Sequence, residues 1–399
     1  MKKFSIFALT PLRRIALVVA CHNAWFWVPI WVLYYRRFTD YSGVALLEAL
    51  SMGVSMMMTI PGGMLADWLG RQRLLMIASI IVAVGSVGAG LSQSFAMLIP
   101  SILLLSFGGG LYQVSIHALI YDTLKSHHQE YRYEWVLGKF MTVQMLSAAL
   151  ASTIGGILYG CNPRYPWFAI SIFMFGCLFI IRTIEEPKLE MKHDTFFQFL
   201  REAGKGISFL LRKEWMIGLP LIVIGVFLTM DFSGLWDIQA VEYGFSSREL
   251  GILLTLTYIT LAIVSAFVPR YMKRLNEKSI LIGLAGLFAF FWLSSAYVIG
   301  VVGGGFLIAR SVFSVLFDLK ASVVWNRMIP SNIRATTLSV ISIIRGLPYI
   351  VVSWGVGMLL ERIGIAPIVR VFSIVLFFVC VGTWGMWLKK YFFQKNLSA

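Results

Sequence analysis

The sequence predicts an all-α membrane protein with twelve transmembrane helices arranged as two bundles of six. The 399 residues are 58% hydrophobic and only 13% charged, whereas soluble domains carry about 25% charged residues. Apolar runs of about 20 residues, the length that crosses the hydrocarbon core of a bilayer, recur along the whole chain. The longest polar stretch, 185–215, leaves half of these runs on either side.

The apolar runs set the order of the spans and the division of the chain. We expect an N-terminal bundle over 1–184, a cytoplasmic linker over 185–215 and a C-terminal bundle over 216–399. Within the linker, apolar residues recur at helical spacing beside basic residues, which predicts an amphipathic helix on the membrane surface. The spans are placed near 15–35, 43–62, 74–91, 97–121, 136–159, 166–184, 216–237, 249–268, 279–298, 303–324, 336–360 and 367–388.

The distribution of basic residues predicts the orientation. The chain has 34 Lys and Arg against 19 Asp and Glu, a net charge of +15. Most of the basic residues fall on the side of the two termini and the linker, and basic residues in short loops mark the cytoplasmic side. We therefore expect a multi-pass protein of the inner (plasma) membrane with both termini in the cytoplasm, and no binding of nucleic acid. The opposite side holds Arg36, Arg37, Arg164, Arg248 and Arg362.

The sequence carries no residue set typical of an enzyme or a metal site. It lacks a P-loop of the form G-x-x-x-x-G-K-[ST], so ATP is not expected to drive the protein directly. Cys21, Cys177 and Cys380 lie inside apolar runs and Cys161 lies in a short loop, which indicates free thiols rather than bridges. We expect no catalytic residues, no metal and no cofactor.

A short segment between spans two and three, residues 63–73 (G-M-L-A-D-W-L-G-R-Q-R), has the character of a tight cytoplasmic turn. Gly63 allows close packing of helices, and Gly70 permits a sharp turn in a very short loop. Asp67 is an acid at the membrane edge, where the N-terminus of a neighbouring helix would stabilise it. Arg71 would anchor the turn to the inner face.

This segment resembles the signature loop G-x-L-A-D-x-x-G-R of the major facilitator superfamily, and it stands where that family has it. Segments 115–122 and 334–339 resemble the family's close of span four and entry to span eleven. The resemblance implies two six-helix bundles with a substrate handled between them by alternating access. The chain departs from the proton-linked drug exporters of the family, because the Gly-Pro of their span-five motif is missing before Gly155 and Gly156.

Ionisable residues inside the apolar spans are the candidates for the transport site, because a charge within the bilayer is costly and usually functional. Asp231 in span seven and Arg310 in span ten lie at matching estimated depths, and the resemblance implies that both spans face the central cavity, so we expect the two to pair. Estimated depth also pairs Asp318 in span ten with Arg345 in span eleven. Each pair is either linked to protons or substrate or is a structural lock between neighbouring helices.

Residues of spans one and four extend this set. His22 and His117 lie near the cytoplasmic third of their spans, where they either relay protons or are hydrogen-bonded packing residues. Trp25 and Trp27 lie deeper in span one. Beside an acid such as Asp231 they would hold an amphiphilic cation by cation–π contact; the alternative is that they face lipid.

Three residues near the outer ends of spans one and two have a less definite role. Tyr34 and Tyr35 fit an aromatic belt at the membrane interface. Glu48 lies one turn inside the outer end of span two, where it either serves the transport site or reaches only to the interface.

The cytoplasmic ends of the spans predict a gate. The resemblance makes spans two and four neighbours, so we expect Arg71 to pair with Asp122. We expect Asp67 against the N-terminal end of span eleven, at 335–339, where unpaired N–H groups carry partial positive charge. This contact would favour the outward-open state. The alternative is that Asp67 caps its own turn.

These observations predict a secondary active transporter, not an enzyme. We expect proton-coupled export of an amphiphilic, drug-like small molecule by a monomer in the lipid bilayer. The alternatives are proton-coupled uptake of a metabolite and a non-transporting receptor on the same fold.

Overall fold

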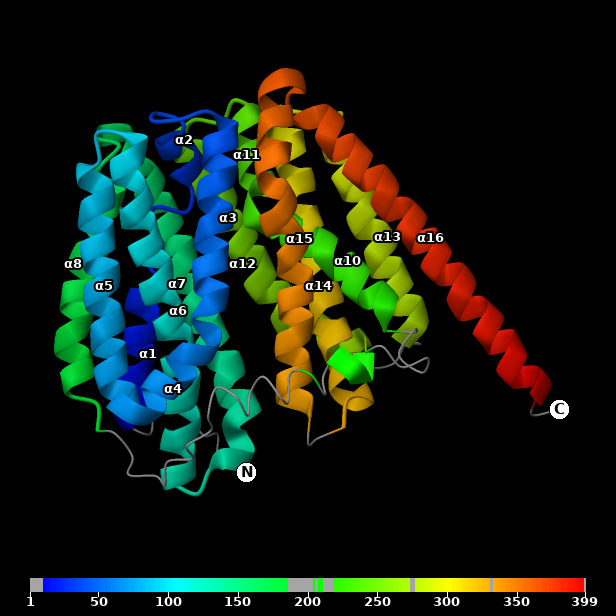
Figure 1. The fold of residues 1–399 in the computed structure, drawn as a ribbon, viewed down its shortest axis with the longest axis horizontal. Coiled ribbons are helices and arrows are strands. Elements are labelled where there is room, and N and C mark those ends of the chain that lie inside the picture. The colour runs from blue at the N-terminus through cyan, green and yellow to red at the C-terminus, as the bar shows by residue number, and fades with distance from the viewer. Residues whose placement is uncertain are drawn as a thin grey trace. The chain divides into compact units, whose positions relative to one another are not determined.

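The computed structural model describes residues 10–185, 204, 207–210, 218–272, 277–330 and 333–397, and the regular structure of these residues is helical. Figure 1 shows the helices in chain order. The first half contains α1 (Thr10–His22), α2 (Trp31–Tyr35), α3 (Tyr41–Met57), α4 (Thr59–Leu69), α5 (Arg71–Leu91), α6 (Phe95–Ser126), α7 (Tyr133–Cys161) and α8 (Tyr165–Arg182). The second half contains α10 (Leu219–Met230), α11 (Trp236–Glu242), α12 (Ser247–Met272), α13 (Glu277–Ser295), α14 (Gly300–Met328), α15 (Arg334–Ile363) and α16 (Ile365–Leu397).

The predicted fold class, an all-α membrane protein, is confirmed. Nine helices of the described chain are long and apolar enough to cross a membrane. Two shorter apolar helices, Tyr41–Met57 and Ser279–Ser295, match predicted spans two and nine. Every predicted span coincides with one helix or with a broken pair of helices.

The chain forms two compact units. Unit 1 contains 1–40, 47–196 and 246–262, and unit 2 contains 41–46, 197–245 and 263–399. The start of α3 therefore groups with unit 2, and the first part of α12 groups with unit 1. The boundaries predicted at 184 and 216 remain a prediction. The predicted linker helix falls mostly outside the described residues, of which 204 and 207–210 are helical.

Each unit is a helix bundle around its own buried core. In unit 1, α5 lies beside α6 and α8; in unit 2, α13 lies beside α14 and α16 (Figure 1). Glycine allows a close approach of two helices in unit 1. A Cβ on Gly85 of α5 would lie 2.9 Å from the carbonyl oxygen of Ser101 on α6, so the two backbones touch where small residues permit it.

Span one is not the continuous helix that its apolar sequence predicts. The helix ends at His22 and resumes as a short helix at Trp31. Pro29 has no N–H to donate and disfavours helical geometry in the residue before it. At the other end of the break, the Asn23 side chain donates to the carbonyl oxygen of Val19 at 2.8 Å. Hydropathy alone did not predict this break, because it does not take into account the backbone effects of Pro29 and Asn23.

Cys161 offers a direct test of the predicted orientation. It is an exposed, free thiol at the C-terminal end of α7, on the side that the basic residues assign to the exterior. An impermeant thiol reagent added to intact cells is expected to label Cys161 in the native protein. In a Cys161→Ser background, Lys125→Cys at the end of α6 should be labelled only after the membrane is opened. The reverse pattern would show that the orientation is inverted.

Candidate functional site

The most unusual backbone of unit 2 lies where span seven breaks. Helix α10 ends at Met230, a π-turn covers Asp231–Leu235, and α11 continues from Trp236. Within the turn Gly234 has φ 129°, a left-handed conformation that glycine adopts without strain. The hydroxyl of Tyr349 on α15 donates to the carbonyl oxygen of Ser233, which the broken helix leaves accessible. The break is thus built from a glycine and a hydrogen bond from a neighbouring helix.

Asp231, the first residue of this turn, forms the predicted ion pair with Arg310. The Nη2 atom of Arg310 lies 2.8 Å from Oδ1 of Asp231, and the two side chains are 0% and 1% exposed. The predicted pairing is therefore confirmed. Burying two charges is expensive, and it is tolerated only with close geometry and further hydrogen bonds.

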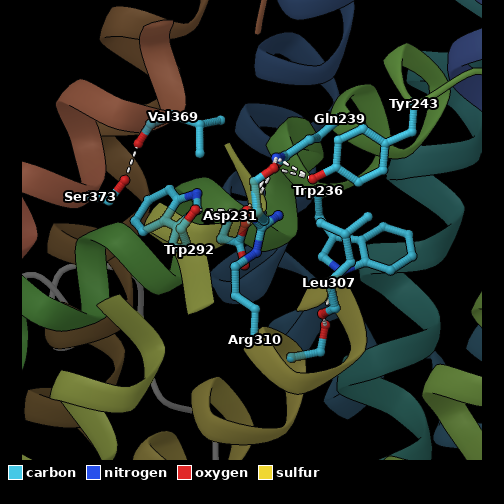
Figure 2. A network of polar contacts seen from close by, with 11 residues as sticks. Asp231, Trp236, Gln239, Tyr243, Trp292, Leu307, Arg310, Val369 and Ser373 are labelled. Carbon is cyan, nitrogen blue, oxygen red and sulfur yellow. Dashed lines mark hydrogen bonds and ion pairs between the residues drawn. The ribbon is translucent and has the colours of Figure 1, made fainter. Parts of the chain in front are cut away.

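Arg310 has two neutral partners as well as the carboxylate (Figure 2). Its Nη1 donates to Oε1 of Gln239 at 2.8 Å and to Oγ of Ser295 at 3.2 Å. Asp231, by contrast, has no hydrogen-bond partner other than Arg310 among the residues that the structure describes. The guanidinium can therefore remain bound when the carboxyl is neutral, whereas the carboxylate depends on the guanidinium.

Around this pair lies a closed network that sequence reasoning missed. Nε2 of Gln239 donates to the carbonyl oxygen of Ser295 at 2.7 Å and to the Tyr243 hydroxyl at 2.8 Å, and that hydroxyl donates to the same carbonyl. The Arg310 guanidinium also lies over the ring of Trp292, 5.7 Å from its centroid. The sequence feature that could have revealed this network was Gln239, a polar amide within an apolar span.

A cavity opens beside the break in unit 2. Its enclosed volume is about 20 Å³, which is room for a water molecule. Its lining is largely apolar and includes Met230, Gly234, Leu235, Ile238 and Tyr349. Met230, which lines this apolar cavity, directly precedes Asp231 in the chain.

The second predicted pair also forms. Nη1 of Arg345 lies 2.7 Å from Oδ1 of Asp318, with the two side chains 16% and 48% exposed. The Arg345 guanidinium lies 5.6 Å from the ring centroid of Trp325. A Cβ on Gly225 of α10 would lie 2.5 Å from the Nε atom of Arg345. This glycine therefore makes room for the Arg345 guanidinium. The carboxylate of Asp318 is partly exposed, so this pair is more accessible to solvent than the Asp231–Arg310 pair.

The signature loop forms the predicted turn. Gly70 has φ 90° between α4 and α5, which explains the glycine there. Nε of Arg71 lies 3.1 Å from Oδ2 of Asp122, so the predicted pair is confirmed. Gly63 packs loosely, because a Cβ there would lie 4.0 Å from Val114. The Asp67 side chain lies outside the described part of the structure, and its contact with 335–339 remains a prediction.

The candidates of spans one and four are not gathered into one site. His22 is buried, with Nε2 at 2.8 Å from Oγ of Ser79 and its ring stacked on Tyr112 at 4.0 Å, as expected for a packing histidine. His117 is exposed on α6. These contacts favour the structural alternative for His22.

The aromatic residues of span one need one correction. Tyr34 and Tyr35 do not form an interfacial belt, because their side chains are 0% and 1% exposed. The break after His22 turns them inward, and the Tyr34 hydroxyl donates to the carbonyl oxygen of Ala89 at 2.6 Å. Trp27 stacks on Trp167 at 5.7 Å. Trp25 is partly buried within the break.

Comparison with known proteins agrees with this architecture. The family model described as Major Facilitator Superfamily matches residues 15–353. The Arabidopsis thaliana protein ZINC INDUCED FACILITATOR 1 is 24% identical over 320 residues, which are 68% of this chain and 64% of that protein. The quinolone resistance protein NorA of Staphylococcus aureus is 22% identical over 275 residues, covering 62% of this chain and 68% of NorA.

A third relative matches only locally, and solved structures show the same fold. An uncharacterized MFS-type transporter of Mycobacterium tuberculosis is 35% identical over 99 residues, 25% of this chain and 14% of that protein. The chain thus spans less than two thirds of the length of two of these curated relatives. A crystal structure of the nucleoside transporter NupG superposes with a TM-score of 0.79 at 14% identity, covering 94% of this chain and 100% of that one. A D-xylose-proton symporter gives 0.70 at 14% identity, covering 95% and 97%.

Proposed function

Because the chain belongs to the major facilitator superfamily, we propose that it is a secondary active transporter that exports an amphiphilic small molecule in exchange for protons. The observation that carries the proposal is the fully buried Asp231–Arg310 pair at the break in span seven. Broken transmembrane helices in transporters mark binding sites near the middle of the membrane. Intramembrane ionisable residues mark ion and proton paths.

The unequal partners of the two charged groups provide the coupling step. When Asp231 takes up a proton, the ion pair is lost, but Arg310 remains bound by Gln239 and Ser295. When Asp231 loses the proton, its carboxylate can form the ion pair with Arg310 again. The site therefore holds two protonation states with small movements of side chains, and the net charge of the pair differs between the two states.

Export is favoured over uptake by the similarity to a protein named for quinolone resistance. The apolar lining of the cavity in unit 2 is of the kind that an amphiphilic solute contacts. We place the protein in the inner membrane as a multi-pass monomer, with both termini in the cytoplasm.

Transport by purified protein in proteoliposomes tests this function. Solutes that raise the melting temperature in a library screen, beginning with a quinolone, would be followed with and without a pH gradient. With an acidic lumen, an exporter that exchanges protons should accumulate the solute inside the vesicle. Outward movement of the solute under the same gradient would instead establish symport. Counterflow of every stabilising solute at the rate of empty vesicles would refute transport.

A gate at the cytoplasmic face would complete the cycle. We expect Asp67→Asn to lower turnover and raise the inward-open population, since the carboxylate would stabilise the N-terminal end of α15 by about 1–2 kcal/mol when that face is closed. Expression should stay near normal. Spin labels on the cytoplasmic ends of α4 and α15 would report the change as a shift in their distance distribution. An unchanged distribution would leave Asp67 as the cap of its own turn.

A further inference from the structure

Asp318 is a carboxylate within a membrane span, and its side chain is half open to its surroundings. It lies on α14, ten residues before that helix ends at Met328, which places it about 15 Å from the helix end. The Asp318 side chain is 48% exposed. A charged group at this depth faces the interior of a bundle or a water-filled cavity rather than lipid. The exposed side of Asp318 therefore faces a water-filled space.

The ion pair with Arg345 uses only one oxygen atom of this carboxylate. Nη1 of Arg345 contacts Oδ1 at 2.7 Å, and among the described residues Oδ2 of Asp318 has no hydrogen-bond partner. The carboxylate of Asp231 differs, because it is fully buried. A solute that reaches Asp318 therefore meets a negatively charged oxygen atom that is not yet bound.

The Arg345 guanidinium has a seat of its own, which does not depend on Asp318. A Cβ on Gly225 would lie 2.5 Å from Nε and 3.1 Å from Cζ of Arg345, so the guanidinium lies close to the backbone of α10. It also lies 5.6 Å from the ring centroid of the buried Trp325. The Arg345 side chain is only 16% exposed. Of the two charged groups, the carboxylate is thus the one that a solute can approach.

A structural lock between α14 and α15 explains this exposure poorly. A partly exposed ion pair contributes little to stability, whereas a charge within a membrane span is costly and is usually retained for a function. A pair that served only to join two helices would be expected to be buried with both carboxylate oxygens bound. The free, accessible oxygen of Asp318 is better explained by binding.

The face of α14 that carries Asp318 is polar over about three turns. Residues four apart are neighbours on a helix surface. Four residues at this interval form the face: Arg310, Ser314, Asp318 and Ser322. Asp318 is therefore about 12 Å along the helix from Arg310, the partner of Asp231. A solute bound at Asp318 would lie near the buried ion pair without displacing it.

We propose that Asp318 binds the positively charged nitrogen of the substrate, which is therefore an organic cation with an ammonium group. The N–H groups of the ammonium donate to Oδ2 of Asp318, while Arg345 stays beside Gly225 and Trp325. This inference rests on the proposed function for the word substrate. The binding step itself needs neither protons nor a gradient.

Binding of benzylammonium to the purified protein in a non-ionic detergent, followed by ligand-observed NMR, tests the site. Benzyl alcohol has nearly the same shape without the charge, and benzoate carries the opposite charge. The native protein should bind benzylammonium about tenfold more tightly than benzyl alcohol, as expected for a hydrogen bond to a charged group. Tighter binding of benzoate than of benzylammonium would make Arg345 the binding residue and overturn the proposal. These comparisons need no variant.

Two variants with opposite expected effects separate binding from a structural lock. Asp318→Asn should weaken benzylammonium binding about tenfold. Arg345→Gln should strengthen it severalfold, because a like charge beside the incoming cation is removed and Oδ1 of Asp318 becomes available. Glu130→Gln, which removes an exposed carboxylate of unit 1, should bind like the native protein. A lock predicts instead that the first two variants both melt at a lower temperature and bind the cation like the native protein, and that result would overturn the proposal.

The site and the proposed function fail in different ways. Equal binding of benzylammonium and benzyl alcohol to the native protein would overturn the site and leave proton-coupled export intact. In transport, loss of a binding residue raises KM and slows counterflow and accumulation alike, whereas loss of the coupling residue leaves counterflow measurable. Absence of gradient-driven transport, with charge-dependent binding preserved, would refute the proposed function instead.

Discussion

Asp231→Asn is expected to abolish pH-gradient-driven accumulation of substrate in proteoliposomes while leaving substrate counterflow measurable. Asparagine keeps the shape of the side chain but takes up no proton, so the gradient loses its point of coupling. Counterflow exchanges substrate for substrate and does not require the proton step. Full gradient-driven accumulation by this variant would exclude Asp231 as the coupling residue, and Asp318→Asn tests the second, more exposed carboxylate in the same assay.

The same pair predicts an asymmetry in stability. Arg310→Gln leaves Asp231 buried without another partner among the described residues, and stranding a buried charge costs about 3–5 kcal/mol. Asp231→Asn should cost less, because Arg310 keeps Gln239 and Ser295. The double variant should be more stable than Arg310→Gln alone. Melting temperatures of the three variants would measure this order, and equal losses for the two single variants would contradict it.

Gly155→Ala is expected to cause the largest loss of folded protein of any single methyl group added to α7. A Cβ at this position would lie 1.9 Å from the carbonyl oxygen of Phe26 and 2.9 Å from its Cα. These are backbone atoms of the break in span one, and they cannot move aside as a side chain can. Overpacking typically costs about 1–3 kcal/mol, and more where backbone must shift.

Gly138→Ala on the same helix is the matched control. A Cβ there would meet nothing within 4 Å, and alanine is favoured over glycine in a helix by up to about 1 kcal/mol. Size-exclusion profiles and melting temperatures of the two variants should diverge, with Gly138→Ala at or above the native protein. Similar behaviour of the two would show that span one does not pack on Gly155 as described.

The charged part of the site was predictable because charges in apolar spans are few and must find partners at the same depth. Depth alone paired Asp318 with Arg345, and depth together with the family resemblance, which implied that spans seven and ten face the same cavity, paired Asp231 with Arg310. Gln239 and Ser295 escaped prediction because neutral polar residues occur in apolar helices for many reasons and can satisfy themselves locally.

Backbone breaks were harder to predict than side-chain pairs. Hydropathy reports whether a segment enters the membrane, and residues 15–35 are apolar throughout, so the end of α1 at His22 was missed. The same error placed Tyr35 at the interface, although it is buried. The signature loop was predicted well because the left-handed turn at Gly70 requires one particular residue type.

The break in span one also bears on how the protein is made. The described part of α1 has 13 residues and is about 20 Å long, short of the roughly 30 Å of hydrocarbon that a lone segment must cross. Gly155 packs against Phe26 in the break, and it is synthesised about 130 residues later. At 5–20 residues per second this delay is on the order of ten seconds. Throughout that interval the first segment lacks the helix on which its break packs. The break in span one can therefore reach its final packing only after α7 has been made.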